Sequence, residues 1–206
     1  MTRHPCPRAL RGSGRLGVLL ALLCLVLPSA ADAQNVSTPG GAPVNADASW
    51  MADFQKRLGT YLNIHETVKA KLPALPRDAT PTQIDRYQRL LGQQIALARP
   101  RVKQGDLFTP GMQGVVRKIL TRIFGGPTGK QLRASVMDEN PVGIKFRVNQ
   151  RYPDTIPLST MPPAVLEELP KLPAELEYRF LGSSLILFDV DSHLIVDYIP
   201  NALPPA

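Results

Sequence analysis

The stretch LEYRFLGSSLILFDVDSHLIVDYI, residues 176–199, decides the fold of this chain. It contains three short apolar runs, at residues 176–181, 185–189 and 194–199, separated by only a few turn-forming residues. Spacers this short allow only antiparallel pairing, because a parallel crossover needs about a dozen residues or more. The sequence therefore predicts an antiparallel β-meander.

A fourth strand is indicated upstream of the meander. Ile144, Phe146 and Val148 alternate with charged residues, which is the period of a half-buried strand. The chain between this strand and the meander is rich in proline. Residues 139–206 are therefore predicted to form a proline-rich linker and an antiparallel β-meander, and one face of so small a sheet needs a covering layer.

Residues 47–138 carry the period of α-helices instead. In the first predicted helix, apolar residues and one histidine recur at steps of three and four and define one buried face. They are Trp50, Phe54, Leu58, Tyr61, His65, Val68 and Leu72. A second helix is expected to begin at the capping box Thr80-Pro81-Thr82-Gln83, and a third at Thr109-Pro110. Short connectors join these helices, so a small antiparallel bundle is expected.

The two patterns together predict an α+β fold. The expected architecture is an N-terminal small helical bundle packed with a C-terminal three- to four-stranded antiparallel meander. The helical region is expected to cover the face of the sheet that the strands leave open.

The first 33 residues predict a signal peptide. They combine a cationic leader, an apolar run of 12 residues at positions 16–27 and the small-residue cleavage site Ala31-Asp32-Ala33. At about 1.5 Å per residue such a run covers roughly 18 Å, too little for a hydrocarbon core of about 30 Å. We expect cleavage near Gln34, a flexible lead-in at residues 34–46, and a periplasmic or secreted product without a transmembrane segment.

Both cysteines, Cys6 and Cys24, lie in this predicted leader. The mature chain is therefore expected to be free of cysteine, which excludes disulfides, thiolate nucleophiles and cysteine metal sites from it. Its stability must come from the packing of its core.

The C-terminal part of the chain also carries a resemblance to known proteins. The residues that carry it are Leu169-Pro170-Lys171-Leu172-Pro173, Tyr178-Arg179-Phe180, Leu185-Ile186-Leu187-Phe188-Asp189 and Leu194-Ile195-Val196-Asp197-Tyr198-Ile199. This pattern resembles the tails of an uncharacterised family of small exported proteobacterial proteins and of periplasmic nickel and cobalt homeostasis proteins. The resemblance covers about residues 144–200. It implies an envelope location and a β-rich tail, and it assigns no reaction.

Charge is distributed unevenly along the chain. Between Trp50 and Arg133 there are 15 Lys and Arg against 5 Asp and Glu, whereas residues 134–206 contain 5 against 10. A basic helical face attracts anionic partners. Its candidate residues are Arg99, Arg101, Lys103, Arg117, Lys118 and Arg122. The alternative is that the acidic sheet neutralises the basic helices, or that the charges form an ordinary solvated surface.

Asp189, Asp191 and His193 form the best cluster of candidate metal ligands. An extended strand would place them on one side, but a tight turn, in which aspartates accept hydrogen bonds from their own backbone, explains the same residues. No glycine pattern of a nucleophile elbow flanks Ser159 or Ser183. No cofactor is predicted, and nucleic acid is not an expected partner of an exported chain without a reading motif.

The sequence leads to an exported, non-catalytic cell-envelope interaction or binding protein of unknown specificity. Its basic helical face is expected to meet an anionic partner such as a lipid headgroup, lipopolysaccharide or an acidic protein. The first alternative is a periplasmic metal-responsive or metal-buffering protein, and the second is an envelope hydrolase. The sequence does not indicate the oligomeric state.

Overall fold

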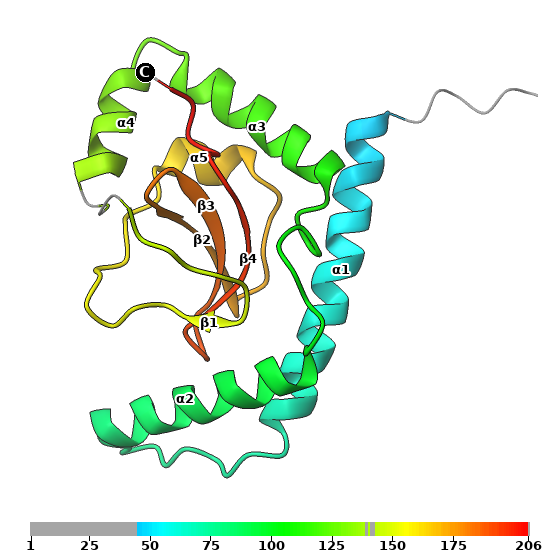
Figure 1. The fold of residues 1–206 in the computed structure, drawn as a ribbon, viewed down its shortest axis with the longest axis vertical. Coiled ribbons are helices and arrows are strands. Elements are labelled where there is room, and N and C mark those ends of the chain that lie inside the picture. Colours follow the sequence, from blue (N-terminus) through cyan, green and yellow to red (C-terminus); the bar gives the residue numbers. More distant parts are fainter. Residues whose placement is uncertain (1–44, 139, 141–142, 206) are drawn as a thin grey trace, which may run out of the picture. The chain divides into compact units, whose positions relative to one another are not determined.

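The computed structural model describes residues 45–138, 140 and 143–205 (Figure 1). The predicted signal peptide at residues 1–33 lies outside the described residues, as do residues 34–44 of the predicted lead-in.

The described chain folds into helices and one antiparallel sheet, which confirms the predicted α+β class. The helices are α1 (Ala46–Lys69), α2 (Pro81–Ala98), α3 (Pro110–Phe124), α4 (Gly129–Asp138) and the short α5 (Pro163–Glu168). The strands are β1 (Gln150–Arg151), β2 (Leu176–Leu181), β3 (Ser184–Asp189) and β4 (Leu194–Ile199). Their order in the sheet is β1-β4-β3-β2, so β2 and the two-residue β1 form its edges.

The helix boundaries follow from local chemistry. The side chain of Asn45 accepts a hydrogen bond from the backbone N–H of Asp47 and caps α1. Thr80 and Gln83 form the predicted capping box at the start of α2. Helix α3 begins at Pro110, as predicted. Proline has no backbone N–H, but the first N–H groups of a helix have no partner within the helix, so no hydrogen bond is lost at this position.

Helix α1 buries the predicted face. Its buried residues are Phe54, Leu58, Tyr61, His65 and Val68. Trp50, which the pattern assigned to the same face, is 41% exposed and lies against α3. A side chain at Gly111 would collide with its indole, since a Cβ there would stand 2.2 Å from the ring. The glycine therefore lets the first turn of α3 approach α1.

The three-stranded meander β2-β3-β4 has the predicted antiparallel pairing. Gly182 turns the chain between β2 and β3 with a φ of 57°, a conformation that glycine adopts without strain. His193 turns it between β3 and β4 with a φ of 56°, which is uncommon for a non-glycine residue. A register shift between Leu187 and Phe188 interrupts the β3–β4 ladder.

The predicted strand at residues 144–148 is wrong, because the fourth strand is β1, a few residues later. Ile144 and Phe146 pack on the second apolar cluster, and the ring of Phe146 lies edge-on to that of Tyr198 at 4.8 Å. Alternation thus identified the side chains that face the sheet. Only at Gln150 and Arg151 does the backbone reach the edge of β4 to form a ladder.

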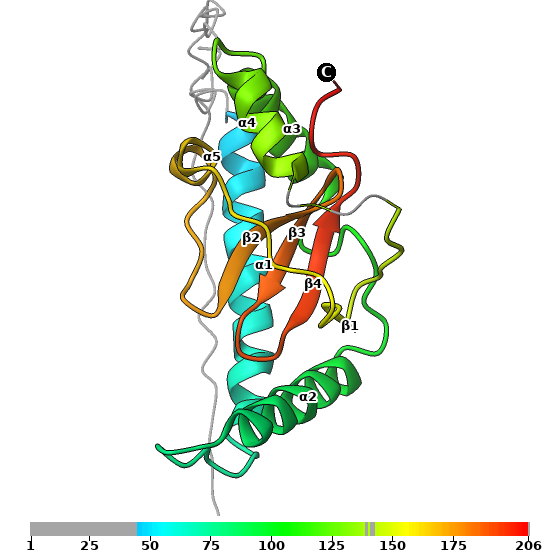
Figure 2. The same cartoon turned by 90° about the vertical axis from the view of Figure 1, so that its left-hand side faces the viewer.

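The sheet is covered on both faces. Leu185 and Leu187 of β3 belong to the larger cluster with the helices, whereas Ile186 and Phe188 belong to a second cluster with Tyr152. Figures 1 and 2 show α1 running along one face of the meander, with α2 and α3 packed near its opposite ends. The coverage that a small sheet requires is therefore supplied by α1 on one side and by the irregular chain before β2 on the other.

Replacing Phe54 by Ala should lower the free energy of unfolding by about 3–5 kcal/mol. Phe54 is fully buried, and its ring stacks on Phe108 at a centroid distance of 5.2 Å. Chemical denaturation of the purified variant measures the loss. The control is Leu97→Ala on α2, where the side chain is 70% exposed and little change is expected. Equal stability of both variants and the parent would contradict the packing of α1 described above.

Candidate anion-binding site

Helix α1 and the connector between α2 and α3 enclose a hollow of about 500 Å³. Arg57, Arg99 and Arg101 line it together with Thr60 and Tyr61 of α1. The hollow therefore gathers three arginines from two elements that lie far apart in the sequence, with Asp106 as the one acidic residue among the described residues that line it.

Arg99 forms the rigid base of this basic hollow. Only 8% of the residue is exposed, and its guanidinium carbon lies 4.9 Å from the centroid of the Tyr61 ring. Its Nη1 donates to Oδ1 of Asn149 at 3.0 Å, and Nδ2 of Asn149 donates to the carbonyl of Arg99 at 3.1 Å. Burial lowers the pKa of Arg99, but a guanidinium stays charged in proteins. The hollow thus contains a fixed positive charge in surroundings that screen it weakly.

The other cations of the connector are differently placed. Arg57 donates from Nε to Asp53 at 2.7 Å and from Nη1 to the carbonyl of Asp106 at 2.8 Å. Arg101 and Lys103 are exposed, and their side chains make no hydrogen bond or ion pair with any described residue. Arg101 lines the hollow and is free to engage a ligand there, and Lys103 is a second free cation on the same connector.

The connector is held in place by one buried carboxylate, Asp197 of β4. Its Oδ1 accepts from the backbone N–H of Gly105 at 2.9 Å, and its Oδ2 accepts from Leu107 and Phe108 at 2.8 Å each. Burial raises the pKa of Asp197, and the backbone donors act in the opposite direction. Gly105 has a φ of 91°, which only glycine adopts readily. The wall of the basic hollow is therefore fixed by the sheet.

The remaining predicted anion-binding residues lie on α3 and already have partners. Arg117 donates to the carbonyls of Pro200 and Asn201 at 2.6 Å each. Lys118 pairs with Asp47 at 3.0 Å, and Arg122 pairs with Glu168 at 2.7 Å. The structure thus brings Arg99 and Arg101 together, with Lys103 on the same connector, and leaves the α3 cations outside the hollow. The part played by Arg57 was missed, because nothing in its helix predicts which connector it meets.

Behind the basic hollow, a chain of polar side chains runs from α1 to the turn between β3 and β4. The hydroxyl of Tyr61 donates to Oδ2 of Asp189, and burial raises the pKa of this phenol well above its ordinary value. Nε2 of His65 lies 3.5 Å from Asp189 and 3.6 Å from Asp191, and Lys69 donates to Asp191 at 2.6 Å. Spacing by four residues puts these three α1 side chains on one face. Sequence reasoning missed these contacts because it assigned Tyr61 and His65 to the buried apolar face of the helix.

The predicted metal ligands take part in a turn. Oδ1 of Asp189 accepts hydrogen bonds from the backbone N–H of Asp191 and of Ser192, both at 2.9 Å, which confirms the turn interpretation. The ring of His193 lies edge-on to Phe188 at 5.4 Å. Within the part of the chain that the structure describes, no three His, Cys, Asp or Glu side chains are arranged to hold a metal ion.

The two serines considered for a hydrolase have other partners. Oγ of Ser159 is buried and donates to the carbonyl of Phe180 at 2.7 Å, and Oγ of Ser183 donates to Asn201 at 3.1 Å. Neither serine is hydrogen-bonded to a histidine in the described residues, so the geometry supplies no activated nucleophile at these positions.

Comparisons with known proteins do not assign the chain to a family. No protein family, no curated protein and no solved structure matches it.

Asp197→Asn should destabilise the protein by about 3 kcal/mol. Each carboxylate oxygen of Asp197 accepts backbone N–H groups, so an amide NH₂ would face donors in either orientation. Thermal or chemical unfolding measures the loss. The matched control is Asp78→Asn, at an exposed position, which should behave like the parent. An unchanged stability of Asp197→Asn would contradict the role of this carboxylate in fixing the connector.

Proposed function

We propose that this protein is an exported, non-catalytic binding protein of the cell envelope, and that its basic hollow holds an anionic group of an envelope lipid. The observation that carries the proposal is the buried guanidinium of Arg99, held on the Tyr61 ring at 4.9 Å inside a hollow of about 500 Å³. Burying a charge is costly unless a partner compensates it. The nearby carboxylates of Asp106, Asp189 and Asp197 compensate part of this charge. A phosphate group in the hollow would add to that compensation.

The chemistry of the hollow favours phosphate. Guanidinium groups bind phosphate oxygens through pairs of N–H donors, and two such groups, Arg99 and Arg101, face the same space. Lys103, on the same connector, adds a mobile point charge that attracts anions from a distance. The site therefore comprises Arg99 and Arg101 in the hollow and Lys103 on the same connector, whereas Arg57 lines the hollow but is paired with Asp53. Arg117, Lys118 and Arg122 are left out of it, because their charges are engaged elsewhere.

The envelope location is part of the proposal and rests on the predicted leader and on the resemblance of the C-terminal part to exported proteins. The described helices include none with the length and apolar character needed to cross a bilayer. A periplasmic or secreted product would meet anionic headgroups at the membrane surface, where basic residues are attracted electrostatically. The metal-buffering and hydrolase alternatives find no supporting geometry among the described residues.

The double variant Arg101→Glu and Lys103→Glu should bind vesicles containing phosphatidylglycerol at least about tenfold more weakly than the parent. The reason is that two positive charges of the connector become negative and repel the anionic headgroups. The matched control is Lys71→Glu with Arg77→Glu, two exposed cations that do not line the hollow and that change the net charge equally. Co-sedimentation measures both. About 1 M salt should abolish the parent's binding, since the screening length falls to roughly 3 Å.

Two results would contradict the assignment of the hollow. Equal losses in both double variants would mean that only the net charge of the surface matters. If the parent does not bind the vesicles at low salt, the proposed lipid partner is wrong.

Export is tested by the N-terminus of the product. Expression in a bacterium that secretes through an inner membrane should yield a periplasmic or secreted chain that begins near Gln34. Mass spectrometry of the purified fraction identifies this residue. A full-length chain found in the cytoplasm or the membrane would refute export.

A further inference from the structure

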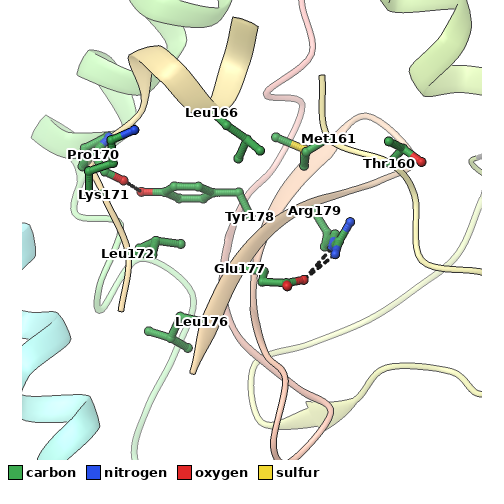
Figure 3. A pocket seen from close by; sticks show the side chains of 10 residues that line it. All are labelled: Thr160, Met161, Leu166, Pro170, Lys171, Leu172, Leu176, Glu177, Tyr178 and Arg179. Atoms are coloured by element: carbon green, nitrogen blue, oxygen red, sulfur yellow. Dashed lines mark hydrogen bonds and ion pairs between the residues drawn. The ribbon is translucent and has the colours of Figure 1, made fainter. Parts of the chain in front are cut away.

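A second hollow, of about 350 Å³, lies between α5, the chain that follows it and the edge strand β2 (Figure 3). Its lining is largely apolar. Figure 3 shows Leu166 and Met161 on one side of the Tyr178 ring and Leu172 and Leu176 on the other. Leu166 is 43% exposed, which leaves its side chain available to a ligand. We call this site the apolar hollow.

The wall formed by the chain after α5 is held at two points. The hydroxyl of Tyr178 donates to the carbonyl of Pro170 at 3.1 Å, and Nε2 of Gln55 on α1 donates to the carbonyl of Lys171 at 3.1 Å. Burial raises the pKa of Tyr178, so its phenol remains protonated and able to donate. The wall is therefore tied both to β2 and to α1.

The opposite wall is held in the same way. Nη1 of Arg179 donates to the carbonyl of Ser159 at 2.9 Å, and Oγ of Ser159 donates to the carbonyl of Phe180 at 2.7 Å. The backbone of both walls is thus fixed by hydrogen bonds within the chain, as in a preformed binding site.

The charged side chains that line the apolar hollow indicate the charge of the ligand that it fits. The guanidinium of Arg179 is neutralised by Glu177, to which its Nε donates at 2.9 Å. Lys171 is exposed, and its ammonium makes no hydrogen bond or ion pair with any residue that the structure describes. The apolar hollow therefore presents one uncompensated positive charge beside an apolar interior.

We infer that the apolar hollow binds an amphipathic monocarboxylate, a medium-chain fatty acid, with its alkyl chain among Leu166, Met161 and Leu172 and its carboxylate at Lys171. A volume of about 350 Å³ lies at the lower end of the range of small-molecule sites, roughly 300–1,000 Å³. A single ammonium matches a single negative charge, whereas a dianionic phosphate would remain half-compensated. The inference is independent of the basic hollow, since the two hollows share no lining residue.

Decanoate is the probe for this site. Isothermal titration of the mature chain should show saturable binding of one decanoate. Lys171→Gln should weaken it about tenfold, the effect of losing one hydrogen bond to a charged group. Decanol should bind more weakly than decanoate, and its affinity should be the same in the parent and in Lys171→Gln.

Leu166→Trp should fill the apolar hollow and abolish decanoate binding. The matched control is Leu97→Trp, on the exposed surface of α2, which should bind decanoate as the parent does. Both substituted leucines are partly or largely exposed, so both variants should fold, and circular dichroism checks that they do. The double variant Arg101→Glu and Lys103→Glu should bind decanoate normally, which separates this test from that of the basic hollow.

Three outcomes would overturn the inference. One is the absence of saturable decanoate binding, and another is binding that Lys171→Gln and Leu166→Trp leave unchanged. The third is tighter binding of a short peptide with an apolar C-terminal residue, which would make the apolar hollow a peptide site.

Discussion

The hydrogen bond from Tyr61 of α1 to the buried carboxylate of Asp189 joins the two halves of this structure. At one end, Asp189 also accepts two backbone N–H groups and so shapes the turn between β3 and β4. At the other end, the ring of Tyr61 supports the guanidinium of Arg99. A buried carboxylate is tolerated only when its oxygens are well satisfied, so the helix, the turn and the basic hollow depend on one another.

Some of the excess positive charge of the helical region is neutralised by acidic residues of the C-terminal part. Arg122 pairs with Glu168, Lys69 with Asp191 and Arg89 with Asp154, each joining an element of the helical region to the C-terminal part. Such exposed pairs contribute little stability individually. Their main consequence here is to remove cations from the available surface. Unpaired cations beside concave surfaces therefore identify candidate sites better than the net charge does.

Both hollows have an unpaired cation beside a concave surface, but the lining is charged in the basic hollow and largely hydrocarbon in the apolar hollow. The basic hollow combines a buried, immobilised arginine with the free guanidinium of Arg101, a combination suited to an anion that carries more than one charge. The apolar hollow combines a mostly hydrocarbon lining with a single free ammonium, which suits a monoanion with an apolar body. In both, a side chain of the sheet fixes one wall: Asp197 accepts hydrogen bonds from the connector in one, and Tyr178 donates a hydrogen bond to the chain after α5 in the other.

The sequence by itself determined the main helices and the three-stranded meander of this protein, because their signals are local. Three apolar runs with short spacers sufficed for the meander, and the spacing of Phe54, Leu58 and Tyr61 sufficed for the buried face of α1. Alternation at residues 144–148 identified inward-facing side chains but not a strand, since a strand also needs a partner within reach. Only the tertiary structure decided which charges are free. Arg99 and Arg122 look alike in the sequence, but Arg99 is buried on the ring of Tyr61 and Arg122 pairs with Glu168. Contacts between residues so far apart along the chain produce no periodic pattern from which they could be predicted.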